Sequence, residues 1–404
     1  MSSASIPDLQ RAGGASQPRD VSRQHPRATA SLAALRRLAE RALPPILAFA
    51  LARGIVLLIG AIIRVNAAVP DVWITWDSGI YRSISQHGYT LVAAPGKPSG
   101  LDGSAGWFPL YPWLVRGCVE ITGMHHDVAM LLLPAIFCMM SLLLLWDRFI
   151  VPAIHDRRDR WLCLLTAAVF PGMIYQHAPF PIAQTTFFIL LHLHLMRTQS
   201  WTCAGLAAAL AGMSHPMGSL LVATSLLWTM RPCLPRHEPI DRPGALLACA
   251  LACLGGFAVL LSGRIAVGAW DAYFAVQSNF QHTIQNPLSV LWHHLRTLGQ
   301  SYRFQPPSHQ TLLLTLMMLQ LAATLMPLRR RLGGLDRLLS VFAAVYFVFP
   351  LCISFVAEYR AHATLLPCAL LLRHVPRRTQ ALLLLLCLVV AIEMSWRYLL
   401  GRVF

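Results

Sequence analysis

The stretch ALLLLLCLVV, from Ala381 to Val390, consists of apolar residues alone and is typical of a membrane helix. Further apolar runs along the chain are long enough to cross a bilayer, which takes about 20 residues per helix. In total 56% of the residues are hydrophobic and 12% are charged, whereas a soluble domain has about 25% charged residues. The sequence therefore predicts an all-α, polytopic membrane protein with roughly eleven transmembrane helices.

Arginine-rich segments give the predicted topology. Residues 1–42 lack the apolar core of a cleavable signal peptide, so we interpret them as a disordered, cytoplasmic, Arg-rich tail, and residues 43–404 as one transmembrane domain. Arg36, Arg37 and Arg41 precede the first span and favour a cytoplasmic N-terminus. The later basic loops are expected on that same side: His155–Arg160, Arg231–Arg242, Arg329–Arg337 and Arg373–Arg378. Two long loops remain for the outer side, residues 66–127 and 268–310.

The formal net charge of +16 raises the alternative of nucleic-acid binding. The arginines, however, are gathered in short loops beside apolar helices, where they set topology and contact anionic lipid head groups. A nucleic-acid-binding protein would present a basic face on a soluble domain. We therefore predict membrane lipids as partners and no nucleic acid. Lys97 is the only lysine, which indicates a GC-rich bacterial genome and hence the bacterial inner membrane.

Histidine and cysteine residues form no recognisable metal motif. The chain contains 10 cysteines and 16 histidines, but neither a Cys-x-x-Cys pair nor a His-Glu-x-x-His pattern. We interpret the histidines near the predicted outer side as exposed residues at the membrane interface. They are His87, His125, His126, His177, His215, His282, His293, His294, His309 and His362. No metal site and no cofactor are therefore predicted, and a need for a divalent cation stays open.

A single acid stands in an aromatic part of the first outer loop, VWITWDSGIYRSISQHGYT, residues 72–90. Intervals of three and four residues between large side chains predict an interfacial helix with its tryptophans in the head-group layer. These side chains are Trp73, Trp76, Ile80, Ile84 and His87. Asp77 and Tyr81 lie beside this stripe. Asp77 either stabilises the first turn of the helix or supplies a carboxylate to a site at the membrane surface.

The segment GWFPLYPWLVR, residues 106–116, follows in the same loop. Its prolines, Pro109 and Pro112, alternate with aromatic residues and stiffen the chain. Because Trp and Tyr combine an apolar body with a polar tip, such a wall suits a sugar or a lipid. This wall strengthens the interpretation of Asp77 as a functional carboxylate, and the helix cap stays open as the alternative.

These two segments resemble the first-loop signature of the PIG-V family, the second mannosyltransferases of GPI-anchor assembly, and of its bacterial relatives. The shared elements are a Trp-Asp pair, a Tyr four residues after the Asp, a Gly-Tyr pair and a Phe-Pro-x-x-Pro element. They stand at Trp76, Asp77, Tyr81, Gly88, Tyr89, Phe108, Pro109 and Pro112. Weaker similarity extends to VGAWDAYFAVQS, residues 267–278, and to EYRAHATLLPCALLL, residues 358–372.

The resemblance implies a GT-C-like fold and an inverting glycosyltransferase. It would transfer a hexose, mannose in the family, from a polyprenyl-phosphate donor to a lipid or glycan acceptor on the outer face. Such enzymes need no nucleotide site and use an acid of the first outer loop as catalytic base, here Asp77. The anionic leaving group needs cations around it, and guanidinium groups pair with phosphate through two hydrogen bonds. The candidate substrate-binding residues are Trp76, Tyr81, Trp107, Phe108, Tyr111, His282, Arg303 and Arg360, with His309 behind them.

Two segments depart from the family pattern. YQHAPFPIAQTTFF, residues 175–188, lacks an acid that such proteins often carry, and SHPMG has His215 where a basic residue is common. Two other classes of protein therefore stay open: a transporter or flippase for a lipid-linked substrate, and a non-catalytic subunit of a glycosylation complex. Transporters tend to carry ionisable residues at mid-membrane. Here Glu393 and Arg397 are the main such charges, and at a spacing of four residues they can pair with each other.

Overall fold

A computed structural model describes residues 26–230, 241–280, 284–298, 308–353 and 358–402, with only the backbone described for 26–38. The chain divides into two units, residues 1–42 and 43–404. Residues 26–42 were predicted to be disordered, but in the structure they form the first part of helix α1 (Pro26–Ile62). The rest of the predicted tail lies outside the described residues.

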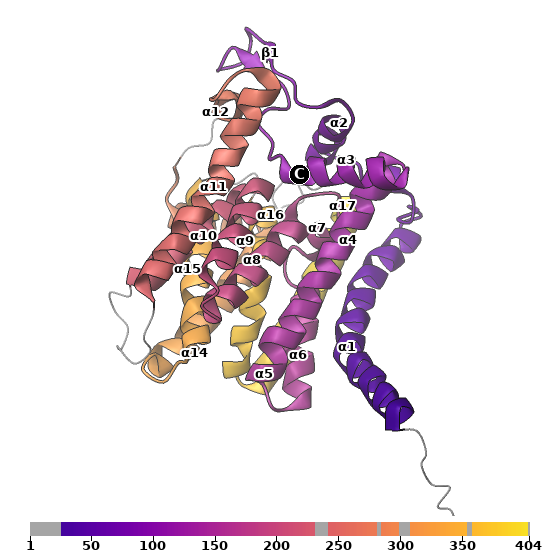
Figure 1. The fold of residues 1–404 in the computed structure, drawn as a ribbon, viewed down its shortest axis with the longest axis vertical. Helices are drawn as coiled ribbons and strands as arrows, with labels where there is room; N and C mark the ends of the chain where they lie inside the picture. Colours follow the sequence, from indigo (N-terminus) through magenta and orange to yellow (C-terminus); the bar gives the residue numbers. More distant parts are fainter. Residues whose placement is uncertain (1–25, 231–240, 281–283, 299–307, 354–357, 403–404) are drawn as a thin grey trace, which may run out of the picture. The chain divides into compact units, whose positions relative to one another are not determined.

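Helices make up almost all of the described chain (Figure 1). A single two-stranded antiparallel ribbon, β1 (Val92–Ala93) with β2 (Leu101–Asp102), lies in the first outer loop. The helices after α1 are η1 (Pro70–Trp73), α2 (Asp77–His87), α3 (Leu110–Thr122), α4 (His126–Leu145), η2 (Trp146–Ile150), α5 (Val151–Ala153), α6 (Arg157–Ala168), α7 (Met173–His177), α8 (Ile182–Arg197), α9 (Trp201–Ser214), α10 (Pro216–Met230), α11 (Arg242–Val267), α12 (Ala272–Ser278), α13 (Pro287–Thr297), α14 (Ser308–Leu328), α15 (Gly334–Ile353), α16 (Glu358–His362), η3 (Ala363–His374) and α17 (Arg377–Leu399).

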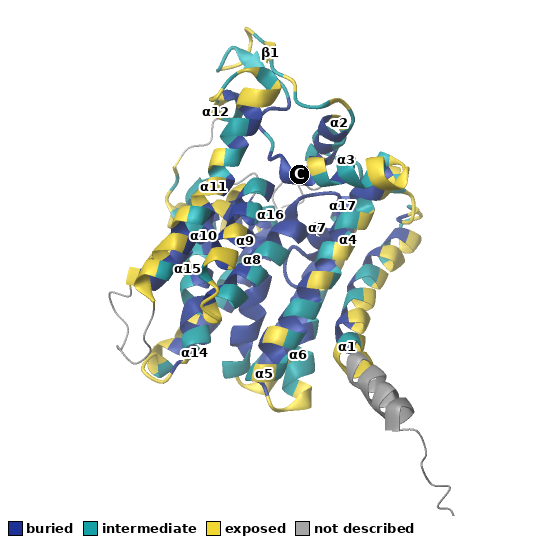
Figure 2. Cartoon of the chain, viewed as in Figure 1, coloured by how far each residue is buried: buried dark blue, intermediate teal, exposed yellow. Residues whose placement is uncertain are grey.

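Six stretches of the described chain are helical, long and apolar enough to cross a membrane. They are Ala39–Ile62, His126–Ala153, Arg242–Val267, Ser308–Leu328, Gly334–Ile353 and Arg377–Leu399. Exposed residues run along these helices (Figure 2). Many of them are large and apolar, as expected for helices in contact with lipid. The prediction of an all-α, polytopic membrane protein is confirmed. The predicted number of roughly eleven spans also counted shorter segments, and α9 and α10 are such shorter apolar helices.

The core of the larger unit is built around η3, a 3₁₀-helix. Its residues from Ala363 to Leu372 are all buried, and it packs against α6, α8, α14, α15 and α17. Runs of 3₁₀-helix longer than three or four residues are uncommon and often lie near functional elements. Since α16 directly precedes η3, the core fixes the place of α16 at one end of the helices (Figure 1).

Three of the basic loops are joined by ion pairs. Arg377 Nε binds Asp159 Oδ1 at 2.7 Å, and Arg373 Nη2 binds Asp336 Oδ1 at 2.5 Å. The loops around residues 155–160, 329–337 and 373–378 therefore lie at the same end of the helices, as the positive-inside rule predicted. The loop at Arg231–Arg242 lies mostly outside the described residues.

The two predicted outer loops are largely folded. The first contains η1, α2, the ribbon and α3, and the second contains α12 and α13. The interfacial helix predicted from Trp73 to His87 is shorter than expected, because α2 begins only at Asp77. Trp73 is fully buried rather than placed in the head-group layer. The interpretation of the histidines as exposed is likewise wrong for His177, His294 and His362, which are buried.

Candidate functional site

The Trp-Asp pair lies where the backbone turns sharply into α2. Trp76 has φ 56° and ψ −132°, a positive φ that is rare for a bulky residue. The next residue, Asp77, is the first of the helix. The hydroxyl of Ser78 donates back to the carbonyl oxygens of Thr75 and Trp73 and closes this turn. Backbone strain of this kind is found at binding and active sites.

Trp73 anchors this turn to the transmembrane helices. Its indole Nε1 donates to the carbonyl oxygen of Ala67 at 2.9 Å, and its own carbonyl oxygen accepts from the Tyr398 hydroxyl of α17 at 2.9 Å. The guanidinium of Arg53, from α1, lies 4.5 Å from the centre of its ring. Trp73 thus contacts both α1 and α17, the first and the last helix of the described chain. These contacts set the position of Asp77.

Asp77 forms an ion pair with Arg360 of α16. Arg360 Nη1 donates to Asp77 Oδ2, and the two side chains are 12% and 31% exposed. Among the described residues, Arg360 is the hydrogen-bond partner of this carboxylate. Asp77 is also the acid in the first turn of α2, where a negative charge stabilises the helix. The ion pair therefore adds to the helix-terminus interpretation and does not exclude it. The partial exposure of Asp77 leaves an oxygen open to a ligand.

Arg360 has an N–H donor that makes no hydrogen bond within the described part of the chain. Its guanidinium carbon lies 5.4 Å from the ring centre of Phe180, and its buried Nε has no hydrogen-bond partner among the described residues. Burial by itself would lower the pKa of Arg360, but Asp77 and its tyrosine neighbours raise the pKa above its usual value. A charged guanidinium with an unused buried donor is suited to bind an anionic oxygen.

Tyrosine side chains surround the ion pair. Tyr81 is buried and its ring meets that of Tyr111 edge-on at 5.4 Å. Burial and then the Asp77 carboxylate raise the pKa of Tyr81 well above its usual value, so its hydroxyl stays protonated. Burial also raises the pKa of Tyr359, next to Arg360, to about 12. The carboxylate therefore faces neutral hydroxyl groups and one cation.

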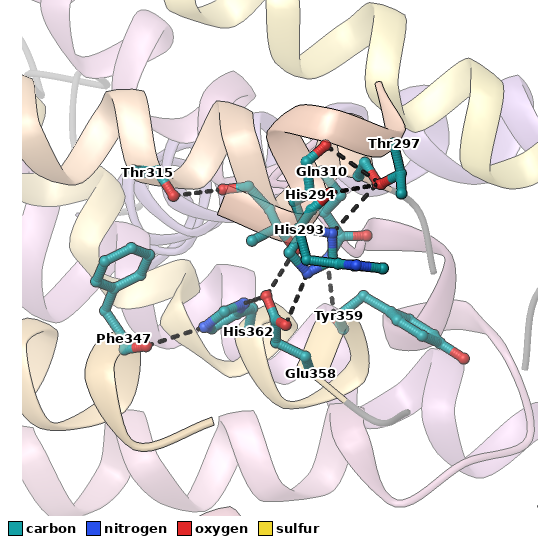
Figure 3. Close-up of polar contacts among 11 residues, drawn as sticks. His293, His294, Thr297, Gln310, Thr315, Phe347, Glu358, Tyr359 and His362 are labelled. Carbon is teal, nitrogen blue, oxygen red and sulfur yellow. Dashed lines mark hydrogen bonds and ion pairs between the residues drawn. The ribbon is translucent and has the colours of Figure 1, made fainter. Parts of the chain in front are cut away.

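A buried polar cluster holds α16 in place (Figure 3). Glu358 Oε2 lies 3.0 Å from His294 Nε2 of α13. Glu358 Oε1 accepts a hydrogen bond from the Thr311 hydroxyl of α14 at 2.7 Å and lies 3.5 Å from His362 Nδ1. Gln310 Nε2 also donates to the Tyr359 carbonyl oxygen at 2.8 Å. These contacts fix the helix that carries Arg360. Sequence reasoning missed Glu358, although it stands two residues before Arg360 in the segment EYRAH.

The remaining candidate residues are not all brought to the Asp77–Arg360 pair. Phe108 is buried, with its ring 5.3 Å from that of Tyr273 and 6.5 Å from that of His215. Trp107 lies further out, edge-on to Phe280 at 6.0 Å. His309 belongs elsewhere, because its Nδ1 binds Glu393 Oε1 at 3.1 Å in a cluster that includes Arg397. His282 and Arg303 lie outside the described residues. The predicted pairing of Glu393 with Arg397 is confirmed, at 2.7 Å.

Potential metal ligands do not converge in the described part of the chain. No group of three or more His, Cys, Asp or Glu side chains is placed there to hold a metal ion.

The chain is similar to two crystal structures of the oligosaccharyltransferase of Archaeoglobus fulgidus. One, a complex with Zn and sulfate, has a TM-score of 0.43 and 14% identity over 81% of this chain and 48% of that one. The other, tethered by a disulfide bond to an acceptor peptide containing the NVT sequon, has a TM-score of 0.45 and 13% identity over 88% of this chain and 54% of that one. The chain thus spans about half the length of these proteins. Likeness at this level bears on neither activity nor substrate.

No protein-family model matches the sequence, and a comparison with curated proteins finds no significant relative.

Proposed function

We propose that this protein is an inverting membrane glycosyltransferase that moves a hexose, mannose in particular, from a polyprenyl phosphate to a hydroxyl group of an acceptor. The observation that carries the proposal is the Asp77–Arg360 pair, a partly exposed carboxylate beside a cation that has a spare donor. The two groups suit the two charges that the reaction moves: a proton to be taken from the acceptor and a phosphate to be released.

The step follows from these two groups. Asp77 accepts the proton of the acceptor hydroxyl while that oxygen bonds to the anomeric carbon of the donor. The bond from this carbon to the phosphate oxygen breaks on the opposite side, and the polyprenyl phosphate leaves with the electron pair. Arg360 binds the phosphate through its remaining N–H groups, which weakens its hold on Asp77 and frees the carboxylate to act as base.

The donor and the sugar are taken from the first-loop resemblance to the PIG-V family. A lipid-linked donor agrees with a site at one end of helices that are long enough to span a membrane. The acceptor is a lipid or a glycan. We place the protein in the bacterial inner membrane with the N-terminus in the cytoplasm, because Arg36, Arg37 and Arg41, at the N-terminal side of the first apolar run, favour that orientation.

The test is a transfer assay with purified full-length protein and a panel of polyprenyl-phosphate sugars. Asp77→Asn keeps the size of the side chain but removes its ability to accept the proton, so transfer should fall at least about 100-fold. Asp71→Asn, on an exposed acid of the same loop, serves as the matched control and should keep full activity. Thermal unfolding of both variants shows whether each one is folded.

Two results would contradict the proposal. Full transfer by folded Asp77→Asn would remove the carboxylate from the chemistry. Absence of transfer with every donor, in a preparation that moves lipid-linked sugars across vesicle membranes, would identify a flippase instead. Sugar transfer by the purified chain alone excludes a non-catalytic subunit.

A further inference from the structure

An open surface cavity of about 510 Å³ lies beside α2, and its lining residues Val92 and Phe280 are themselves exposed. This volume is within the range of about 300–1,000 Å³ that is typical of small-molecule sites. Its lining comes from one flank of α2, from the first outer loop and from Phe280, two residues beyond the end of α12. The lining residues are Gly79, Ile80, Ser83, Val92, Asp102, Gly103, Ser104, Trp107 and Phe280.

Contacts next to the lining residues hold the loop segments of the cavity together. Tyr89 donates its hydroxyl proton to the Trp107 carbonyl oxygen at 3.0 Å. Asn279 Nδ2 donates to the Leu101 carbonyl oxygen at 2.8 Å, and Gln277 Nε2 donates to that of Gly106 at 2.6 Å. The last two bonds join the beginning of the second outer loop to the first. The cavity is therefore preformed by two loops that are about 170 residues apart in sequence.

The chemistry of the lining favours a neutral, hydroxyl-rich ring. Trp107 and Phe280 present aromatic surfaces against which the C–H face of a sugar can pack. The Asp102 carboxylate and the Ser83 hydroxyl offer acceptors and a donor for sugar hydroxyl groups.

Asp102 is the one charged group among the lining residues. Its Oδ1 accepts a hydrogen bond from the Gly103 N–H at 2.8 Å, and its Oδ2 lies 3.6 Å from Lys97 Nζ, which is not a lining residue. Because no cation lines the cavity, the lining offers a phosphate no charged partner. A lipid chain is disfavoured as well, because it would cover the half-exposed Asp102–Lys97 pair without supplying a hydrogen bond.

The cavity lies next to the candidate base. Ile80, which lines the cavity, follows Asp77 by three residues in the same helix, so the two side chains are neighbours on its surface. The phosphate-binding group Arg360 approaches Asp77 from α16 and is not part of this lining. Asp77 does not line the cavity either, so a glycan bound there would extend past Ile80 to bring its acceptor hydroxyl to Asp77.

We propose that this cavity binds the sugar residue of a glycan acceptor, with Trp107 stacked on the ring and Asp102 bound to its hydroxyl groups. The assignment as acceptor subsite rests on the proposed function and narrows it: the acceptor is a neutral carbohydrate, and the charged lipid donor binds on the Arg360 side. Sugar binding by the cavity itself does not depend on catalysis.

Binding is measured without turnover by saturation-transfer NMR on the full-length protein in a detergent that contains no sugar. The probes are methyl α-mannopyranoside, methyl α-glucopyranoside and mannose 6-phosphate. The neutral glycosides should receive saturation and the phosphate should not. Trp107→Ala should weaken glycoside binding about tenfold, the effect of losing about 1.4 kcal/mol of contact. Trp107→Phe, which keeps a ring, should restore part of it.

The matched control is Trp270→Ala, which removes an exposed tryptophan that packs on Phe257 and does not line the cavity. It should bind the glycosides like the wild type. Asp102→Asn is a second test that leaves the aromatic wall intact, and it should also weaken binding. Asp77→Asn should bind normally while it loses transfer.

Equal saturation of the glycosides in the wild type and in folded Trp107→Ala, or binding of the phosphorylated sugar alone, would overturn the assignment. Trp107-dependent binding by a protein that transfers no sugar would leave the cavity as a carbohydrate site and refute the proposed function. The experiments thus distinguish a wrong assignment of the cavity from a wrong proposed function.

Discussion

Arg360 donates a hydrogen bond to Asp77 across 283 positions of the chain. The bond joins the first outer loop to the short helix before η3, so neither partner is placed by its own segment alone. A partly exposed acid is held against a buried cation, and the cation is held by the core. A substitution of either residue should therefore change the position of the other.

Arg360→Gln should reduce transfer by about 100-fold or more, since loss of one charge-stabilising donor typically has an effect of this size. Arg360→Lys keeps the charge but not the planar set of donors, so its transfer should be intermediate. The donor concentration dependence of the rate separates weaker binding from slower chemistry. Arg264→Gln, on an exposed arginine at the end of α11, is the control. A fully active, folded Arg360→Gln would rule out the phosphate-binding role.

Tyr81 and Tyr111 should respond differently to loss of the hydroxyl. The Tyr111 hydroxyl donates to the buried Met130 carbonyl oxygen at 2.7 Å, and Pro134, four residues further along α4, has no N–H to offer it. Tyr111→Phe should therefore lower the free energy of unfolding by about 1–3 kcal/mol, the effect of an unsatisfied buried acceptor. Tyr81→Phe should leave stability nearly unchanged and act on transfer instead. Denaturant unfolding in micelles measures the stability of both variants. Equal stability losses for Tyr81→Phe and Tyr111→Phe would contradict this distinction.

Removal of Glu358 should destabilise the protein. Glu358→Ala leaves His294 and Thr311 without their buried partner and should lower the free energy of unfolding by about 3–5 kcal/mol. Glu358→Gln keeps the shape and should lower it less. Glu120→Gln, on an exposed acid of α3, is the control. If Glu358 positions Arg360, transfer by folded Glu358→Gln should also fall, whereas unchanged transfer would limit Glu358 to stability.

The same cluster should make stability dependent on pH. Burial by itself would raise the pKa of Glu358, but the hydrogen bond from His294, the charges of His362 and His294 and the Thr311 hydroxyl together lower the pKa below its usual value. The folded form thus binds its proton less readily than the unfolded form. The stabilisation is complete above a pH of about 4.5 and is lost as the pH falls through the lowered pKa.

His362 acts in the same direction. Burial lowers its pKa, against an opposing effect of Glu358, so neutral His362 stabilises the fold above a pH of about 6.5 and less so below. The free energy of unfolding should therefore fall from pH 7 to pH 4. Glu358→Gln should flatten the lower part of that curve, and an unchanged acid limb would show that Glu358 does not cause it.

The sequence predicted the elements of the site better than their partners. The Trp-Asp pair and Tyr81 could be found because the spacing and the first-loop resemblance are local. The role of Glu358 could not, since its partners come from α13 and α14 and no local pattern joins them. Arg360 was selected for its charge, but only the packing of α16 against the first outer loop shows which carboxylate it meets.

The prediction for Trp73 was wrong although its pattern is local. Its spacing to Trp76 and Ile80 predicted one continuous helical face, yet the positive φ of Trp76 breaks the helix before Asp77. No Gly or Pro marks that break, so periodicity was extended through it. The prediction that the histidines are exposed was wrong for a related reason. His294 and His362 are polar residues, and only the hydrogen-bond partners that the fold brings to them explain why they are buried.

Trp73 should be the residue on which the placement of Asp77 depends most. Trp73→Ala removes a fully buried ring between α1 and α17 and should lower the free energy of unfolding by about 3–5 kcal/mol. Trp73→Phe keeps most of the packing but loses the indole N–H bond to the Ala67 carbonyl oxygen, with an expected loss of about 1–3 kcal/mol. Because the Trp73 carbonyl oxygen also binds Ser78 and Tyr398, the looser turn should move Asp77 away from Arg360. Transfer by Trp73→Phe should then fall further than its stability loss explains, and transfer at the level of the control Trp270→Phe would show that the turn is held without the indole.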